Sequence, residues 1–343
     1  MGSLSTYLDW LRRDTPTRWW HDSADPAELD LALDRGACGA TTNPVLVAAA
    51  MARAPAAWTD ARTSVDDDRV SADSRAEARV EIAVTSAARR LLPTFERSGG
   101  QDGFVCAQVN PARAGDRHEM LAMARRFHAW APNIAVKLPA TAAGLDVLEA
   151  CVAEGITVTA TVSFTVAQAL AIAERHRCGS MRARRDDLTP GRSFAVLMVG
   201  RLDDYLREVA QDSGLPVEEA DIRQAGLAVA KRAYALYRER GYAATLLVAA
   251  LRGSYHLTEL AGADLVMSIH PTYQAPFVSE DLARQERIDV AVPETTIDQL
   301  NRLPDFVRAY EPDGMTASEF ITYGLTQRTL AQFSESWKAL GAR

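Results

Sequence analysis

The sequence predicts an α/β protein of the (β/α)₈ TIM barrel class, with additional N- and C-terminal helices. First, eight short strand-like segments follow one another along the chain, and most of them precede a helical pattern. Second, residues 133–164 show the pattern of strand, helix and strand, which makes a parallel βαβ unit. Third, polar residues stand at or just past the carboxyl ends of predicted strands, where such barrels place their active sites. These residues are Asp22, Asn43, Gln108, Lys137, Thr161, Arg201 and Arg252.

The elements before residue 133 supply the first three strands. Asp25 and Pro26 open a helix, because Asp favours the N-cap and Pro favours the first helical turn. Ser98, Gly99 and Gly100 interrupt the helical pattern before the third strand. We expect strands at 17–22, 37–43 and 103–110, helices at 4–13, 26–33 and 117–130, and alanine- and arginine-rich helices up to residue 97.

The central βαβ unit contains the most unusual residue of the chain. Residues 134–138 form a short apolar run interrupted by Lys137, and a buried lysine loses hydration, so it is rarely there for packing. Thr141 can cap a helix whose apolar positions recur at helical spacing. Residues 156–163 then alternate apolar with hydroxyl side chains. The hydroxyl face holds Thr157, Thr159, Thr161 and Ser163.

Strand alternation places Lys137 inside the barrel, across from this hydroxyl row, because the apolar strand faces meet the helices. A second explanation also stays open. A lysine at a strand end can extend its ammonium group to water, and threonine has a high β propensity. Spacing alone does not decide between the two.

The second half of the chain supplies the remaining strands. A helix is expected at 166–177, followed by a polar segment at 178–192 that contains Arg182, Arg184 and Arg185 and has the composition of a solvated loop. We expect strands at 193–200, 244–250 and 263–269, a long helix at 219–241, and helices with polar turns at 293–343. The chain is expected to form one domain over residues 1–343, with a barrel core at about 17–275 and a C-terminal helical extension at about 276–343.

Composition excludes several classes of protein. The chain has 343 residues, 48% of them hydrophobic, and a net charge of −7, which argues against nucleic acid as the main partner. No signal peptide is recognisable, and no apolar run is long enough to span a bilayer. The cysteines lack paired spacing, so we expect free thiols in a reducing cytoplasm and no metal site. They are Cys38, Cys106, Cys151 and Cys178.

The polar residues at the strand ends fit one kind of chemistry. A lysine in a partly dry barrel can attack a carbonyl and form a Schiff base, which needs neither metal nor cofactor. Such an enzyme needs a carboxylate to move a hydroxyl proton, and Asp22 is the only carboxylate at a predicted strand end in the first five strands. Arg201 and Arg252 suit a phosphate, although each could equally form a surface ion pair.

Three motifs resemble one known family. Residues 39–44 read Gly-Ala-Thr-Thr-Asn-Pro, residues 136–141 read Val-Lys-Leu-Pro-Ala-Thr, and residues 199–201 read Val-Gly-Arg. Together they resemble the transaldolase family of the class I Schiff-base aldolase superfamily, and the spacing resembles its longer bacterial members. The resemblance runs from about residue 22 to residue 271.

The resemblance implies a role for each matching residue. Lys137 would form the imine with a ketose, Asp22 would act as acid and base, and Thr161 would help to hold a water molecule. Asn43 would bind a substrate hydroxyl, with Thr41, Thr159 and Ser163 as further substrate-binding residues, and Arg201 and Arg252 would bind phosphate. The implied reaction moves a dihydroxyacetone unit from a ketose phosphate to an aldose phosphate, as in the pentose phosphate pathway.

Several positions depart from the family pattern. Gln108 stands where most members have a catalytic glutamate, as in the fructose-6-phosphate aldolase branch. Thr159 replaces a frequent asparagine, and Val196, Met198 and Ala250 stand at positions expected to be serine, phenylalanine and serine. A specialised aldolase, fructose-6-phosphate-aldolase-like or of secondary metabolism, is therefore an alternative. A non-catalytic binding barrel is a second alternative, and the oligomeric state is open, with a homodimer as one option.

Overall fold

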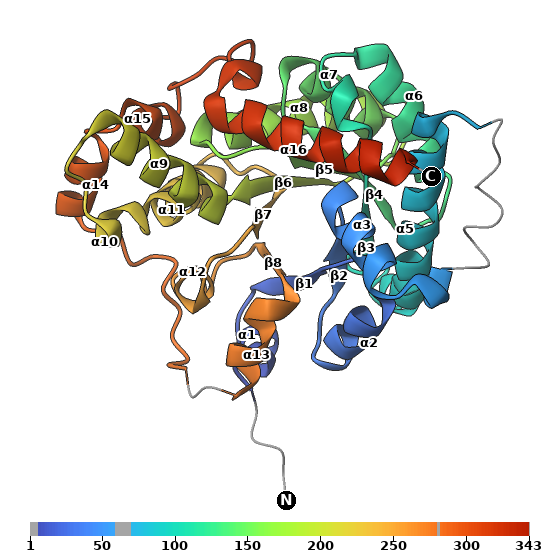
Figure 1. The fold of residues 1–343 in the computed structure, drawn as a ribbon, viewed down its shortest axis with the longest axis horizontal. Helices are drawn as coiled ribbons and strands as arrows, with labels where there is room; N and C mark the ends of the chain where they lie inside the picture. The colour runs from blue at the N-terminus through green and yellow to red at the C-terminus, as the bar shows by residue number, and fades with distance from the viewer. Residues whose placement is uncertain (1–5, 59–69, 280–281, 343) are drawn as a thin grey trace, which may run out of the picture.

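The computed structural model describes residues 6–58, 70–279 and 282–342. In this part of the chain, eight parallel strands close into a barrel in sequence order, and the last strand pairs with the first (Figure 1). The strands are β1 (Arg18–Asp22), β2 (Gly39–Thr41), β3 (Phe104–Gln108), β4 (Ile134–Pro139), β5 (Val158–Thr161), β6 (Ser193–Met198), β7 (Thr245–Ala249) and β8 (Val266–Ile269). The predicted (β/α)₈ barrel is confirmed.

Helices surround the barrel and bury the outer faces of its strands (Figure 1). Those of the first half are α1 (Tyr7–Asp14), α2 (Pro26–Asp34), α3 (Pro44–Arg53), η1 (Pro55–Trp58), α5 (Ala72–Arg97), η2 (Pro111–Arg113), α6 (Arg117–His128) and α7 (Ala142–Ala153). Those of the second half are α8 (Val166–Arg185), α9 (Val199–Ser213), α10 (Glu219–Ile222), α11 (Ala225–Glu239), α12 (Ser254–Thr258), α13 (Pro271–Ser279), α14 (Glu294–Leu300), α15 (Pro304–Tyr310), η3 (Phe320–Thr322) and α16 (Gly324–Gly341).

All eight predicted strands are present in the described residues, and most are shorter than expected. Local backbone requirements explain the shortening. Asn43 was expected to end the second strand, but it is the N-cap of α3 and accepts a hydrogen bond from the backbone N–H of Leu46 at 3.1 Å. Val162 has φ of 55°, a left-handed conformation that ends β5 one residue earlier.

The central βαβ unit has the predicted organisation. The hydroxyl of Thr141 caps α7 by accepting a hydrogen bond from the backbone N–H of Gly144 at 3.1 Å. Gly144 itself is required here, because a Cβ at this position would lie 1.9 Å from the carbonyl oxygen of Pro139. The first turn of α7 therefore packs directly against the carboxyl end of β4.

The predicted loop at 178–192 is wrong for its first part, because α8 continues to Arg185. Packing against α7 extends the helix. At Gly179 a Cβ would lie 2.6 Å from the carbonyl oxygen of Glu149, so only glycine permits this close approach. Arg175 and Arg182 both bind the Glu149 carboxylate, at 2.8 and 3.0 Å.

The single helix predicted at 219–241 is also wrong, since the chain forms α10 and α11 there. The backbone N–H of Gly226, in the first turn of α11, donates to the buried Asp203 carboxylate at 2.8 Å. This bond fixes the start of α11 against α9.

The C-terminal helix α16 lies across α3 and α5 beside the barrel (Figure 1). Arg79 of α5 holds its end by donating to the carbonyl oxygens of Leu340 and Ala342, at 2.6 and 2.7 Å. Parts of three predictions lie outside the described residues. They are residues 4 and 5 of the predicted first helix, residues 59–69 of the helices predicted up to residue 97, and residues 280, 281 and 343 of the predicted extension.

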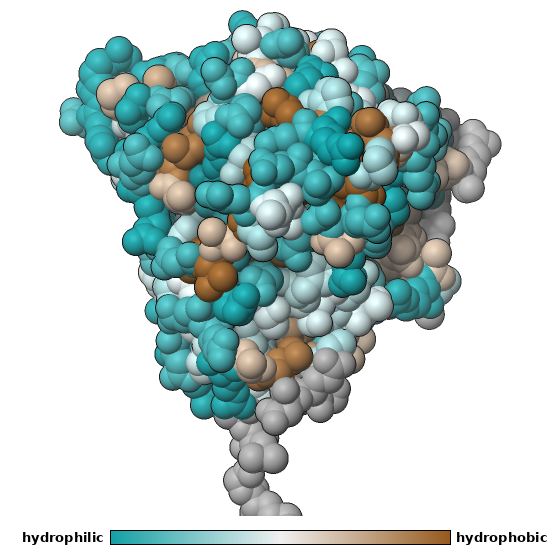
Figure 2. Space-filling view, turned by 90° about the vertical axis from the view of Figure 1, so that its left-hand side faces the viewer, coloured by the Kyte–Doolittle hydropathy of each residue, from teal (hydrophilic) through white to brown (hydrophobic). Residues whose placement is uncertain are grey.

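The face shown in Figure 2 carries polar residues with scattered apolar ones, a normal pattern for a folded protein. Among the described residues, no helix combines the length and apolar character needed to cross a membrane.

Candidate active site

The carboxyl ends of the barrel strands surround a cavity of about 190 Å³. Of the residues that the sequence predicts, it is lined by Asp22, Thr41, Asn43, Lys137, Thr161, Arg201 and Arg252. Gln108, Thr159 and Ser163 do not line it. Residues that are more than 200 positions apart in the chain therefore meet at one place, as expected for a barrel rim.

Lys137 lies on β4 and is only 6% exposed. Its Nζ donates a hydrogen bond to the carbonyl oxygen of Thr42 at 3.0 Å, so the amine is held across the mouth of the barrel. The chain contains only two other lysines, Lys231 and Lys338, and both lie on helices. Burial raises the pKa of the neighbouring Cys106 thiol, against the positive charge of Lys137, so this thiol stays protonated and is a poor nucleophile.

The carboxylate of Asp22 ends β1 and faces the same cavity. The Thr41 hydroxyl donates to Asp22 Oδ1 at 2.6 Å, and the Ser268 hydroxyl of β8 is in turn hydrogen-bonded to Thr41. A hydroxyl has one proton, so this geometry is satisfied when Ser268 donates to Thr41 and Thr41 donates to Asp22. The pair Thr41 and Ser268 thus orients the carboxylate.

Asn43 contributes an amide to the cavity. Its side-chain oxygen is used to cap α3, which leaves the amide N–H₂ as the group that can donate to a ligand. Helix capping therefore fixes the orientation of Asn43 before any substrate arrives.

Two buried oxygen atoms near Lys137 have no hydrogen-bond partner among the described residues: Gln108 Oε1 and Thr161 Oγ1. Gln108 pairs directly with Lys137 in the register of β3 and β4, and Thr161 pairs with Pro139 in the register of β4 and β5. Buried polar atoms normally have partners. The two atoms thus mark a polar position beside the lysine.

Thr159 and Ser163 lie below and beyond the cavity. Thr159 pairs with Lys137 in the register of β4 and β5, but it is fully buried and its hydroxyl lies 3.3 Å from the sulfur of Cys106. Ser163 follows the left-handed Val162, and its hydroxyl donates to the carbonyl oxygen of Val196 on β6. Both hydroxyls are therefore engaged within the protein.

The two arginines differ in their surroundings. Arg252 binds the Asp204 carboxylate through Nε and Nη2, both at 2.8 Å, and donates to the carbonyl oxygen of Ala250. The guanidinium of Arg201 has no hydrogen bond or ion pair within the described residues and lies 5.4 Å from the ring centre of Phe333. Burial, followed by the charge of Arg252, lowers the pKa of Arg201 from its usual value. Arg201 is thus the cation that is free to meet an anion.

The remaining wall of the cavity is largely apolar. It includes Val45, Leu46, Val196, Met198, Leu247, Ala249, Ala250 and Leu251, with Phe333, His270 and Tyr273. Phe333 comes from α16, far beyond the barrel in sequence, and nothing in its local pattern could have assigned it to the site. His270 directly follows β8, so its position at a strand end was a usable signal that sequence reasoning did not take up.

Comparison with known proteins agrees with this geometry. A family model described as transaldolase/fructose-6-phosphate aldolase matches residues 19–343. The chain belongs to this family. A transaldolase from Thiobacillus denitrificans is 30% identical over 363 aligned positions, which cover 99% of this chain and 96% of that protein. A transaldolase from Neisseria gonorrhoeae is 37% identical over 145 positions, 42% of this chain and 41% of that protein.

Membership of the transaldolase/fructose-6-phosphate aldolase family confirms the family that the sequence motifs indicated, and with it the prediction of a transaldolase-like enzyme. A further relative, a transaldolase from Mycolicibacterium paratuberculosis, is 32% identical over 211 positions, 59% of this chain and 55% of that protein. The chain is accordingly an enzyme of the aldolase and transferase type rather than a non-catalytic barrel.

Proposed function

We propose that this transaldolase-like enzyme works through a Schiff base on Lys137 and moves a dihydroxyacetone unit from a ketose to an aldehyde acceptor. The observation that carries the proposal is the buried amine of Lys137, held at 3.0 Å from a backbone carbonyl in the cavity that Asp22 also lines. A largely dehydrated amine beside a carboxylate is the arrangement that imine chemistry requires.

The first half of the reaction breaks the donor. Lys137 Nζ attacks the ketose carbonyl, and the adduct loses water to give a protonated imine. The carbon–carbon bond to be broken joins the carbon beside the imine to a carbon that bears a hydroxyl group. Asp22 accepts the proton of this hydroxyl. That oxygen becomes an aldehyde carbonyl, the carbon–carbon bond breaks, and its electron pair moves into the imine to give an enamine.

The second half reverses these steps on the acceptor. The enamine carbon attacks the aldehyde, Asp22 returns its proton to the new alkoxide, and hydrolysis of the imine frees the product and Lys137. Thr41 keeps the carboxylate in place in both directions, because it donates to Asp22 at 2.6 Å. We further assign to Gln108 and Thr161 the binding of the water that enters and leaves, since both have a buried oxygen without a partner in the described chain.

Sugar phosphates are the proposed substrates. Arg201 has no carboxylate partner within the described residues, and a guanidinium binds phosphate oxygens well. Arg252 is bound to Asp204, and the wall beside it is apolar, which supports one phosphate site centred on Arg201. The Asn43 amide is assigned to a hydroxyl of the bound sugar.

Simple aldol cleavage is a second candidate function. It is suggested by Gln108, because the fructose-6-phosphate aldolase branch that the sequence resembles at this position also has glutamine there. The enamine would then be protonated and released as free dihydroxyacetone rather than passed to an acceptor.

We also propose a domain organisation and a cellular location for the chain. Barrel and C-terminal helices form one functional unit, since Phe333 of α16 lines the cavity of Lys137. A cytoplasmic location is supported by four cysteines that are all free thiols. A homodimer stays a prediction.

The test is a screen of ketose donors, phosphorylated and not, with and without acceptor aldehydes, read by product mass. Transfer gives a new ketose only when the acceptor is present, and simple cleavage gives free dihydroxyacetone without it. A protein that forms neither product nor borohydride-stable adduct with any ketose would overturn the proposal.

A further inference from the structure

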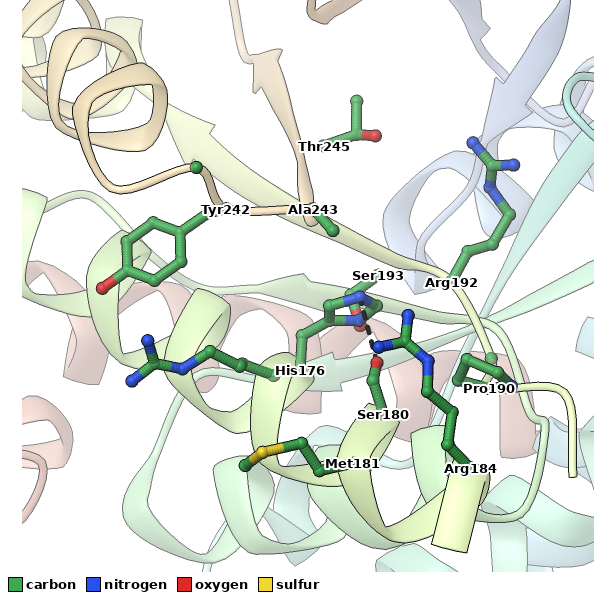
Figure 3. A pocket seen from close by; sticks show the side chains of 13 residues that line it. His176, Ser180, Met181, Arg184, Pro190, Arg192, Ser193, Tyr242, Ala243 and Thr245 are labelled. Carbon is green, nitrogen blue, oxygen red and sulfur yellow. Dashed lines mark hydrogen bonds between the residues drawn. The ribbon is translucent and has the colours of Figure 1, made fainter. Parts of the chain in front are cut away.

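A second cavity, of about 410 Å³, is shown in Figure 3. Its lining residues place it at the amino ends of the strands, the opposite end of the barrel from Lys137. It opens between the last turns of α8 and the starts of β6 and β7, and its lining includes Ser193 and Thr245, the first residues of those strands. The volume falls within the range of small-molecule sites. The arginine-rich segment that was expected to be a solvated loop forms one of its walls.

The charge of this cavity is unbalanced. Arg177, Arg184 and Arg192 line it, and its described lining contains no carboxylate. Arg177 is paired with Glu174. Arg184 has no ion pair or side-chain hydrogen bond within the described residues, whereas the other arginines of α8 are each paired with a carboxylate. Those arginines are Arg175, Arg177, Arg182 and Arg185.

Arg192 adds a second guanidinium group without an ion pair in the described residues. It is half-buried, and within the described residues its guanidinium bonds only to the neutral side chain of Gln101. Burial, followed by the positive charge of Arg18, lowers the pKa of Arg192. The adjoining cavity, which Arg192 also lines, differs because Arg18 is balanced there by Asp102 and Asp264.

Neutral donors complete the site. His176 is 8% exposed, with Nδ1 2.9 Å from the Ser193 hydroxyl and Nε2 3.4 Å from the Ser180 hydroxyl. Burial, then the charges of Arg184 and Arg192, lowers the pKa of His176, so the ring is neutral at pH 7 and has one N–H. The serine that accepts this N–H keeps its own O–H for a ligand. In Figure 3, Arg184 extends toward Ser180 and His176.

We propose that this cavity binds a small phosphate monoester, with the phosphate against Arg184 and Ser180. A phosphate near neutral pH carries more negative charge than a carboxylate, which suits two guanidinium groups that have no ion pair in the described residues. Its additional oxygen atoms suit the serine hydroxyls. The site is separate from the Lys137 cavity and does not depend on the reaction proposed there.

The experiment measures binding of glycerol 3-phosphate, which has no carbonyl and cannot form an imine. Calorimetry is done on Arg201→Gln protein, so that the cavity of Lys137 contributes little, with inorganic phosphate and glycerol as comparison ligands. Adding Arg184→Gln is expected to weaken binding at least about tenfold, because a charge-assisted hydrogen bond is lost. Adding Arg185→Gln is the matched control, since Arg185 is the next residue but is paired with Asp186.

The position of the ligand is checked by the imidazole resonance of His176, identified with a His176→Asn variant. We expect glycerol 3-phosphate to move this resonance in the wild type and in Arg185→Gln protein. The proposal is overturned if Arg184→Gln and Arg185→Gln proteins bind equally, or if the resonance does not move at ligand concentrations up to roughly 10 mM. Arg184 is exposed, so its replacement leaves the packing of α8 intact, and circular dichroism verifies this.

Discussion

The two sides of the Lys137 cavity are built differently. The side formed by β1 to β5 supplies Asp22, Thr41, Lys137 and Thr161, and the first three are held in place by hydrogen bonds. The side formed by β6 to β8 supplies an apolar wall, and its two arginines lie just beyond the strands. In the proposed function, the bond-making groups and the groups that contact the rest of the substrate therefore come from different strands.

This separation has a physical consequence. Side chains that break and form bonds must be held within a few tenths of an ångström, so the hydrogen bonds of the first side leave little freedom. The second side only has to match the shape and charge of the substrate. Val196, Met198 and Ala250 lie on this side, at positions where the family resemblance leads us to expect other residues. We infer that the reaction type is fixed by the first side and the substrate range by the second.

Replacement of Lys137 tests the first side most directly. Lys137→Met is expected to abolish borohydride trapping of a ketose and to lower turnover by a factor on the order of 10⁴ or more, because no other lysine is placed in the barrel. Intact mass spectrometry measures the adduct. Lys338→Met, on the outer helix α16, is the control and should trap normally. Trapping by Lys137→Met protein would show that another amine is the nucleophile.

Replacement of Asp22 separates imine formation from bond cleavage. Asp22→Asn should lower kcat by roughly 10²–10⁴-fold, because an amide cannot accept the hydroxyl proton. The imine should still be trapped by borohydride. The measurements are kcat and adduct yield, with Ser268→Ala as a milder comparison that loosens the carboxylate through Thr41. If trapping is lost together with turnover, Asp22 acts on the lysine itself.

Local patterns in the sequence were sufficient to predict which residues lie on the first side of the cavity. Lys137 interrupts an apolar strand, Asp22 and Thr161 end their strands, and Thr141 caps the next helix, so each was visible from its neighbours in the chain. Strand ends that carry polar residues meet in a closed barrel for topological reasons alone. The fold and the position of these residues at one end of the barrel could therefore be predicted.

Long-range contacts could not be predicted in the same way. The pairing of Arg252 with Asp204 depends on how β7 packs beside α9, and the contact of Phe333 with Arg201 depends on where α16 returns. The continuation of α8 to Arg185 likewise depends on packing against α7. Neither the composition of the chain nor the periodicity of its apolar residues predicts these contacts.

Gln108 lies at the end of β3, on the first side beside Lys137, and controls the fate of the enamine in our proposal. Gln108→Glu should change the ratio of free dihydroxyacetone to transfer product by about a hundredfold, because a carboxylate can exchange protons with the bound water. Both products are quantified with and without acceptor. Gln108→Met, of similar volume, removes the polar group and serves as control. An unchanged ratio would falsify this role and leave Gln108 as a packing residue.

The arginines test the second side. Arg201→Gln should raise KM for phosphorylated sugars by roughly ten- to hundredfold and leave KM for unphosphorylated sugars nearly unchanged, since a charge-assisted contact contributes about 1.5–3 kcal/mol. Arg252→Gln should have a smaller effect, because its guanidinium already binds Asp204. Asp204→Asn should then lower KM for phosphorylated sugars by freeing Arg252. Equal effects of Arg201→Gln on both substrate types would indicate a structural role.

The smallest expected effect concerns the backbone of the second side. Ala250 follows β7 with φ of 58°, a left-handed conformation that costs a non-glycine residue about 1–2 kcal/mol. Glycine removes this cost but loses roughly 0.5–1 kcal/mol through the greater freedom of the unfolded chain. Ala250→Gly should therefore raise the free energy of unfolding by about 0.5–1 kcal/mol.

Ala249 is the matched control for this prediction, because it is the adjacent residue and lies in the regular part of β7. Ala249→Gly should lower the free energy of unfolding by about 0.5–1 kcal/mol, since only the entropic cost applies there. Urea unfolding of the two variants gives the contrast directly, as opposite shifts of the midpoint. If both variants are destabilised equally, the backbone at Ala250 is held without strain, and this prediction is wrong.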